Sequence, residues 1–234
     1  MIKAKFFSEI EKINKPTIIS AFPTIGFSGK ACIDKLVELT NSKLLAQFDI
    51  EKLPIVFVSK GKIEYPSIKL YHKKNKKENI LFLTADYQPH ERNHSDFAEY
   101  VIKMFKKINA KQLIIVGEIP QTTKKMREVR LEIHPKKSSD LNEKIPIMGF
   151  NAALISSAFQ NKIPISMILK ESKPNVLDIR FVRDSIKELS KKLGLGINLN
   201  KLEKEYLKEM SKIKEISLKD AEQIIAKDST GYIG

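Results

Sequence analysis

An apolar run that ends at a proline and continues into two glycines constrains the fold of this chain more than any other feature. Residues 17–22 read Thr-Ile-Ile-Ser-Ala-Phe, and a β-branched run of this length predicts a buried strand. Pro23 ends the run, and Gly26 and Gly29 supply backbone freedom and close approach in the turn that follows. Apolar residues then recur at helical spacing over residues 33–40. The sequence therefore predicts a strand, a tight turn and a helix.

The same turn offers the free amide groups of a helix N-terminus next to the cation of Lys30, a setting that suits a phosphate. A dinucleotide fingerprint needs three glycines, however, and a P-loop needs Gly-Lys followed by Ser or Thr. Here only Gly26 and Gly29 align, and Lys30 is followed by Ala31. We therefore interpret the glycines as a turn with close helix packing, and we expect no bound cofactor.

Short apolar segments and helical patterns alternate along the rest of the chain. Strands are predicted over residues 17–22, 43–50, 54–59, 67–72, 79–85, 111–117, 145–148 and 164–169, and helices over residues 28–40, 95–109, 150–161 and 176–193. The strands between residues 43 and 85 follow one another too closely for crossover helices, so some must pair antiparallel. Helices would cover both faces of this mixed sheet. The predicted fold class is α/β, a three-layer α/β/α sandwich.

Length and composition fit an intracellular protein with one main core. The chain has 234 residues, of which 42% are apolar. Its single cysteine, Cys32, excludes an internal disulfide framework, and its place on the first predicted helix favours a packed residue over a nucleophile. No run approaches the ~18 apolar residues that span a bilayer, and residues 1–6 lack a signal-peptide core. We expect a cytoplasmic protein.

The pattern changes after residues 194–196, which read Gly-Leu-Gly. We therefore expect an α/β domain over residues 1–196 and a C-terminal helical extension over residues 197–234. The last part of the extension, residues 228–234, has two glycines and no helical pattern. It is expected to form a mobile tail.

The extension carries a narrow apolar stripe. Leu202, Tyr206 and Met210 recur on one face of a predicted helix whose other positions are almost all charged. Such a stripe suits docking on a partner helix and would be poorly buried in a lone domain. We therefore expect these three residues to form the interface of a homo-oligomer.

The formal net charge of +14 raises nucleic acid as a partner. The basic residues gather in two clusters, which are Lys73, Lys74, Lys76 and Lys77, and Lys124, Lys125, Arg127, Arg130, Lys136 and Lys137. Neither cluster has the interleaved aromatic residues of a nucleic-acid stacking platform. We favour a solvated basic surface that steers an acidic protein partner, and a basic nucleic-acid-binding protein is the alternative.

Residues 90–94 read His-Glu-Arg-Asn-His, a literal H-E-x-x-H motif. On a helix the imidazoles of His90 and His94 would share one face and bind zinc, with Glu91 as the general base. The motif directly follows a proline, however, and the helix is expected to begin near Asn93, which leaves the first histidine outside it. We expect neither a metal nor catalytic residues here. A metal-dependent hydrolase that uses this region is the enzymatic alternative.

A series of short motifs follows the order seen in one known family. The series begins with a Pro-Thr-apolar strand and a Phe-Pro-x-x-Gly-x-x-Gly turn (residues 16–29), followed by an Ile-Val-Phe-Val strand (55–58) with a glycine turn. Next come an apolar-Lys-Leu-Tyr strand (68–71) and a strand ending in an acid and Gln-Pro (81–89). The later motifs are residues 113–117, Gly149 with a small-residue helix, and the strand at residues 163–164. In this order, residues 15–195 resemble the PAC2 family, the proteasome assembly chaperones and their archaeal homologues.

The resemblance implies a phosphorylase/hydrolase-like sheet topology. Proteins with related folds include nucleoside phosphorylases, and the carboxyl ends of strands in open α/β sheets commonly line ligand crevices. We therefore expect a candidate pocket at Thr24, Gly26, Asp86, Glu118 and Gly149. A nucleoside-type hydrolase is a further enzymatic alternative, although fold likeness by itself does not establish activity.

The resemblance also implies a function, that of a non-enzymatic, ATP-independent assembly chaperone that binds proteasome α subunits. In that family a C-terminal hydrophobic-Tyr-x tail takes part in binding. The final residues here read Gly-Tyr-Ile-Gly, which puts the tyrosine third from the end. We expect Tyr232, Ile233 and Gly234 to bind the partner, because they combine an aromatic anchor, an apolar neighbour and a terminal charge.

Overall fold

The computed structural model describes residues 2–51, 55–59, 61–75, 78–121, 127–133, 144–173 and 177–198, together with Asn200 and Lys204. The chain divides into two units, Met1–Gly196 and Ile197–Gly234. The fold given below is that of the first unit. The predicted interface residues Leu202, Tyr206 and Met210 and the predicted partner-binding residues Tyr232, Ile233 and Gly234 lie outside the described residues, so both assignments stay predictions.

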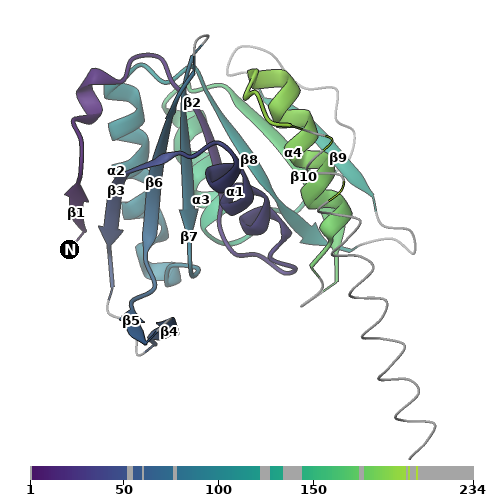
Figure 1. The fold of residues 1–234 in the computed structure, drawn as a ribbon, viewed down its shortest axis with the longest axis horizontal. Coiled ribbons are helices and arrows are strands. Elements are labelled where there is room, and N and C mark those ends of the chain that lie inside the picture. The colour runs from purple at the N-terminus through teal and green to yellow at the C-terminus, as the bar shows by residue number, and fades with distance from the viewer. Residues whose placement is uncertain are drawn as a thin grey trace, which may run out of the picture. The chain divides into compact units, whose positions relative to one another are not determined.

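An eight-stranded sheet forms the centre of the first unit, in the order β1-β3-β6-β7-β2-β8-β10-β9 (Figure 1). Its strands are β1 (Lys3–Phe6), β2 (Thr17–Ala21), β3 (Lys43–Asp49), β6 (Ile68–Lys74), β7 (Asn79–Ala85), β8 (Gln112–Pro120), β9 (Glu128–Ile133) and β10 (Ile165–Ser172). The four strands β7, β2, β8 and β10 run parallel, and β1, β3, β6 and β9 pair antiparallel. The parallel strands are almost entirely buried, which explains their continuous apolar runs.

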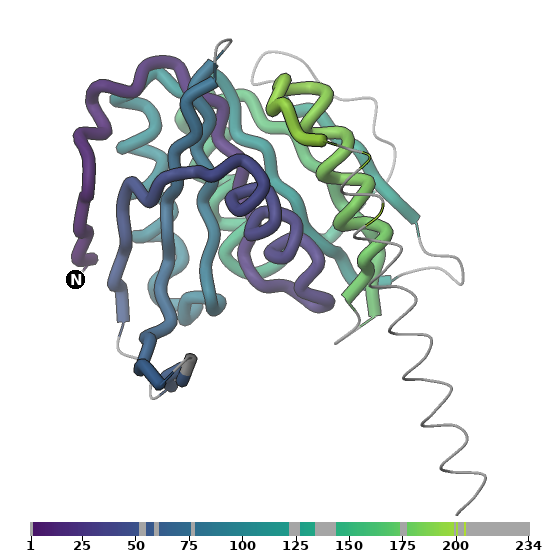
Figure 2. Tube along the Cα trace, in the orientation of Figure 1, coloured from purple at the N-terminus to yellow at the C-terminus, as the bar shows by residue number. Residues whose placement is uncertain are grey.

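Four α-helices cover the two faces of this sheet. They are α1 (Ser28–Leu39), α2 (His94–Lys107), α3 (Gly149–Gln160) and α4 (Ile179–Leu193), and two short 3₁₀ helices are η1 (Ile10–Lys12) and η2 (Glu91–Asn93). Helix α1 packs beside α4 on one face, and α2 packs beside α3 on the other (Figures 1 and 2). This arrangement confirms the predicted mixed sheet and three-layer sandwich. Among the described helices, none has the length and apolar character needed to cross a membrane.

One predicted strand is wrong, and three strands were missed, namely β1, β9 and the strand at residues 62–64. Residues 145–148 form no strand; Ile145 and Ile147 pack against the core without joining the sheet, so their alternation reflects burial alone. Strand β9 lies instead within the second basic cluster. Its polar residues face solvent and alternate with half-buried apolar residues, as expected for an edge strand.

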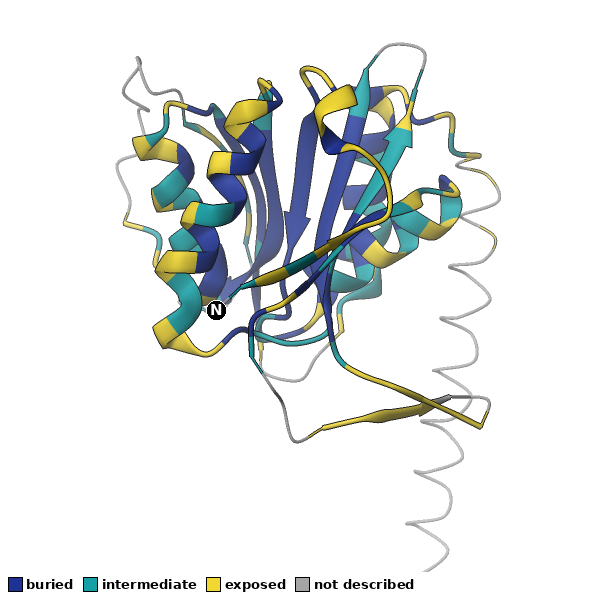
Figure 3. Cartoon of the chain, turned by 90° about the vertical axis from the view of Figure 1, so that its left-hand side faces the viewer, coloured by how far each residue is buried: buried dark blue, intermediate teal, exposed yellow. Residues whose placement is uncertain are grey.

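A second, two-stranded sheet lies outside the main one. Strands β4 (Phe57–Ser59) and β5 (Lys62–Glu64) pair antiparallel and lead through a short connection into β6. Ile68 at the start of β6 lies opposite Ala85 at the end of β7. Because β5 leads into the start of β6, the small sheet lies near the end of the main sheet at which β7 terminates. Figure 3 shows it extending from the sheet with exposed residues along its length.

Candidate functional site

A cavity of about 410 Å³ lies at the carboxyl ends of β2, β7 and β8. The chain leaves β2 for α1 on one face of the sheet and leaves β7 for α2 on the other, which opens the crevice where ligands commonly bind in α/β proteins. The cavity is lined by Pro23, Thr24, Ile25, Phe27, Asp86, Tyr87, Gln88, Glu118, Pro120, Met148 and Gly149.

The structure brings four of the five sequence-predicted pocket residues to this cavity, namely Thr24, Asp86, Glu118 and Gly149. Gly26 belongs to the same turn but is not among the lining residues. Sequence analysis missed the aromatic and amide residues that follow β7, although they are the direct neighbours of the predicted Asp86. That these residues bind a ligand stays a prediction.

The buried carboxylate of Glu118 caps helix α1. It accepts hydrogen bonds from the Thr24 hydroxyl and from the backbone N–H groups of Ser28 and, at 3.4 Å, Gly29. These amides belong to the first turn of α1, where a negative charge is favoured by the helix dipole. The position that a phosphate takes in nucleotide-binding turns is therefore filled by a carboxylate of the chain itself.

Close packing of α1 on β8 makes this cap possible. A Cβ atom on Gly29 would lie 2.6 Å from the Val116 carbonyl oxygen and 2.9 Å from the Gly117 Cα atom. Both neighbours are backbone, so a side chain would force α1 away from the strand. The interpretation of this glycine as a close-packing residue is confirmed.

The amide of Gln88 joins the other two loops around the cavity. Its Nε2 donates to the carbonyl oxygen of Pro23, and its Oε1 accepts from the Phe150 N–H at 3.1 Å. Gly149 has a positive φ of 70°, and a Cβ there would lie 3.2 Å from the same Oε1. The turn after β2, the turn after β7 and the start of α3 are thus tied together by one side chain.

Asp86, the acid predicted at a strand end, is part of an ion-pair network. Its Oδ2 accepts from the Ser67 N–H at 3.1 Å and lies 3.5 Å from Lys69 Nζ, and its Oδ1 lies 3.6 Å from Lys30 Nζ. The same groups line a neighbouring cavity of about 150 Å³. Asp86 therefore balances two lysines from β6 and α1 and is poorly placed to act as a free acid or base.

The rim of the cavity is apolar. Phe27 exposes 49% of its surface and Met148 exposes 59%. Burial raises the pKa of the Tyr87 hydroxyl, and the carboxylates of Glu51, Asp49 and Asp86 act in the same direction, so this group stays protonated. An apolar rim over internally paired polar groups suits contact with an apolar side chain better than activation of a nucleophile.

The H-E-x-x-H string lies at the junction of η2 and α2. His90 precedes η2, and its Nδ1 accepts from the Arg92 N–H at 3.3 Å. His94 is the first residue of α2, which confirms the predicted helix start, and its Nε2 donates to the Pro89 carbonyl oxygen at 2.8 Å. Within the described residues, no group of three or more His, Cys, Asp or Glu side chains is arranged to hold a metal ion. A hydrolase that uses this string stays a hypothesis.

Three described members of the basic clusters, Lys73, Arg127 and Arg130, take part in structural contacts. Arg127 Nη2 lies 3.1 Å from Glu171, whose side chain is fully buried, and Arg130 Nε lies 2.8 Å from Glu188. Lys73 donates to a backbone carbonyl at the end of α1. Lys76, Lys77, Lys124, Lys125, Lys136 and Lys137 lie outside the described residues. A nucleic-acid-binding role therefore stays an untested alternative.

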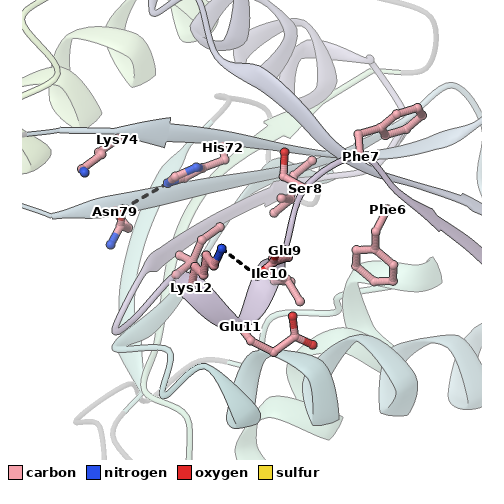
Figure 4. Close-up of a pocket in the computed structure, with 12 residues that line it drawn as sticks. Phe6, Phe7, Ser8, Glu9, Ile10, Glu11, Lys12, His72, Lys74 and Asn79 are labelled. Carbon is pink, nitrogen blue, oxygen red and sulfur yellow. Dashed lines mark hydrogen bonds and ion pairs between the residues drawn. The ribbon is translucent and has the colours of Figure 1, made fainter.

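A larger cavity, of about 970 Å³, lies between residues 6–13 and the β6–β7 hairpin (Figure 4). Four of its polar side chains form two pairs: His72 Nε2 lies 3.1 Å from Asn79 Oδ1, and Lys12 Nζ lies 2.9 Å from Glu9. It opens at the end of the sheet where β7 begins, away from the carboxyl ends of the parallel strands. We therefore regard the cavity beside Glu118 as the candidate site.

Comparisons with solved structures show similar folds in archaea and bacteria. The chain is similar to PbaB of Pyrococcus furiosus, an archaeal proteasome activator, at 16% identity and a TM-score of 0.75 over 92% of this chain and 98% of that chain. It is similar to PbaA of the same organism, an archaeal homolog of proteasome-assembly chaperone, at 18% identity and a TM-score of 0.71 over 99% of both chains.

A bacterial example is the proteasome-assembly chaperone homologue of Mycobacterium tuberculosis, at 13% identity and a TM-score of 0.63 over 85% of this chain and 94% of that chain. A search of curated proteins gave no match. The sequence model of the PAC2 family matches residues 18–217, which is most of the chain. This chain therefore belongs to the PAC2 family.

Proposed function

We propose that this protein is an ATP-independent, chaperone-like factor that binds proteasome α subunits. The observation that carries the proposal is the family match over residues 18–217. The fold shared with PbaB, an archaeal proteasome activator, and with PbaA, an archaeal homolog of proteasome-assembly chaperone, supports it.

The chemistry of the candidate site also favours a binding protein. The carboxylates of Glu118 and Asp86 and the amide of Gln88 are engaged with backbone groups or lysines of the same chain. Catalysis requires acids, bases or nucleophiles that can reach a substrate. In the described cavity these groups hold three loops together instead.

Two further parts of the proposal concern residues 197–234. We expect Tyr232, Ile233 and Gly234 to contact the α subunits as a mobile segment with an aromatic anchor. The apolar stripe of Leu202, Tyr206 and Met210 would join copies of the chain, and several tails in one oligomer would raise the overall affinity through avidity.

The test measures the affinity of purified proteasome α subunits for the full chain, for Tyr232→Ala and for a deletion of residues 231–234. Tyr232→Ala should weaken binding by about 1–3 kcal/mol per site, and the deletion should weaken it at least as much. Phe159→Ala is the matched control, because it removes an aromatic ring that is 50% exposed on the folded domain. A full chain that does not bind α subunits would refute the function. If both tail variants bind as tightly as the full chain, the contact with the α subunits lies on the folded domain and not on the tail.

A further inference from the structure

The small β4–β5 sheet carries an unusual amount of exposed apolar surface. Val58 is 75% exposed and Ile63 is 63% exposed, and the two are cross-strand partners, so their side chains share one face. Val56 directly precedes β4 and Tyr65 directly follows β5, each two positions from Val58 or Ile63, the spacing that keeps side chains on one face of an extended chain. Tyr65 is 70% exposed. We call residues 55–59 and 61–66 the ribbon.

The ribbon is also incomplete as a sheet. Among the described residues, β5 pairs only with β4, so its other edge presents free backbone N–H and C=O groups. A two-stranded sheet alone is marginally stable in water, whereas three or more strands with an apolar face are stable. Both the free edge and the apolar face therefore favour the addition of a further strand.

The charges of β5 are complementary to those of the same strand read in reverse. The strand reads Lys62-Ile63-Glu64, and all three residues are exposed. If two copies of β5 pair antiparallel about Ile63, Lys62 of each copy lies opposite Glu64 of the other. Opposite charges in directly facing positions stabilise such a pair, and like charges oppose it. The same pairing places the two Ile63 side chains next to each other.

We propose that the ribbon is a self-association surface, in which β5 of one copy pairs antiparallel with β5 of a second copy to form a four-stranded sheet. The pairing is isologous, because each copy contributes the same edge. The net charge of +14 does not prevent it: within the described residues of the ribbon the charges are one lysine and one glutamate. Repulsion between more distant charges is screened beyond about 8 Å at physiological ionic strength.

The test is a charge swap in the full chain at physiological ionic strength. Lys62→Glu and Glu64→Lys each place like charges opposite each other at two related positions, so each should raise the dissociation constant of the pair about tenfold. The double variant Lys62→Glu/Glu64→Lys restores both opposite-charge contacts and should return to nearly the wild-type value. Lys103→Glu, on the exposed surface of α2, is the matched control and should have no effect. Analytical ultracentrifugation over a concentration series measures all five proteins.

A cross-link tests the register of the pairing independently. In an antiparallel pair about residue 63, the two Ile63→Cys side chains face each other at a Cα separation that a disulfide can span. Oxidised glutathione should therefore convert Ile63→Cys to a covalent dimer, whereas Phe159→Cys should remain monomeric on a non-reducing gel. The native Cys32 is buried and does not interfere.

Three results would overturn the proposal: a wild-type chain that stays monomeric at 100 µM or above, single charge variants that associate as the wild type does, or a double variant that fails to recover. Because the substituted side chains are exposed, circular dichroism should show an unchanged fold in every variant. The stripe of Leu202, Tyr206 and Met210 is a separate proposed contact that would still join copies in every ribbon variant, so the ribbon is judged only by the change in association between the wild type and the variants.

Discussion

The cavity beside Glu118 and the ribbon both lie at the end of the sheet where β7 terminates, but the cavity's polar groups are paired internally whereas the ribbon's apolar groups are exposed. Around the cavity, polar groups from three loops bond to one another, and Glu118 caps α1. In the ribbon, apolar side chains point into solvent and a strand edge is left open. The first region holds the domain together, whereas the second offers contact to another molecule. Substitutions should therefore affect folding in the first region and association in the second.

The largest effect is expected at the contact between α1 and β8. Gly29→Ala places a methyl group 2.6 Å from a carbonyl oxygen that cannot move without disturbing the sheet, so the variant should lose about 3 kcal/mol or more of unfolding free energy. Urea denaturation measures the loss. Gly117→Ala is the control, because its Cβ would meet the nearest side-chain atom at 3.5 Å, an ordinary contact distance. Equal losses in the two variants would show that close packing is not the reason for Gly29.

Removal of the cap should have the next largest effect. Glu118→Ala leaves the N–H groups of Ser28 and Gly29 without their acceptor in a buried site, which should cost about 2 kcal/mol. Glu118→Gln keeps one acceptor oxygen, so its unfolding free energy should lie between those of Glu118→Ala and the wild type. Glu132→Ala, at a side chain that is 74% exposed, should change stability by less than about 0.5 kcal/mol. A neutral result for Glu118→Ala would show that water replaces the carboxylate.

A smaller and pH-dependent effect is expected at the start of α4. Asp178 accepts hydrogen bonds from Lys170 Nζ at 2.6 Å and from the Phe181 N–H at 3.0 Å. Burial raises the pKa of this carboxyl, but the hydrogen bond and charge of Lys170 together with the N–H groups of Phe181 and Arg180 outweigh burial, so the pKa lies below its ordinary value. Asp178→Ala should therefore cost about 1 kcal/mol at neutral pH.

The sign of the pH effect follows from the direction of that shift. A carboxyl whose pKa is lowered by folding adds stability above its ordinary pKa and loses that contribution as the pH falls through the lowered value. The stability gap between wild type and Asp178→Ala should thus be constant from pH 7 to about pH 5 and should shrink in stronger acid. Denaturation curves at several pH values measure the gap, and a gap that widens in acid would contradict the assignment.

The smallest effect on stability is expected in the ribbon. Val58→Ser replaces a side chain that is 75% exposed, so the unfolding free energy of the dilute chain should change by less than about 0.5 kcal/mol. Sedimentation at high concentration should nevertheless show weaker association. A stability loss above 1 kcal/mol would mean that the ribbon packs on the domain and would remove the contrast between the two regions.

The sequence predicts best what depends on neighbouring residues. The turn at Gly29 and the helix start near His94 follow from local patterns, and the pocket residues follow from the rule that strand ends meet at one edge. The contact between Glu118 and Ser28 joins residues 90 positions apart, and no local pattern indicates it. The apolar segment at residues 55–58 lies in the strand predicted over residues 54–59, of which Phe57–Ser59 forms β4. Its side chains face solvent, which the sequence did not indicate because composition does not reveal whether a face is covered.

The cap on α1 has a consequence for synthesis. The first turn of this helix is completed by a carboxylate made 90 residues later, and β2 pairs with β7 and β8, which are also made much later. A growing chain therefore cannot stabilise its first βα unit until most of the sheet has left the ribosome. Contacts this distant in sequence slow folding, and the exposed apolar segments of an unfinished chain favour aggregation. The early part of the chain must stay protected or disordered until β8 arrives.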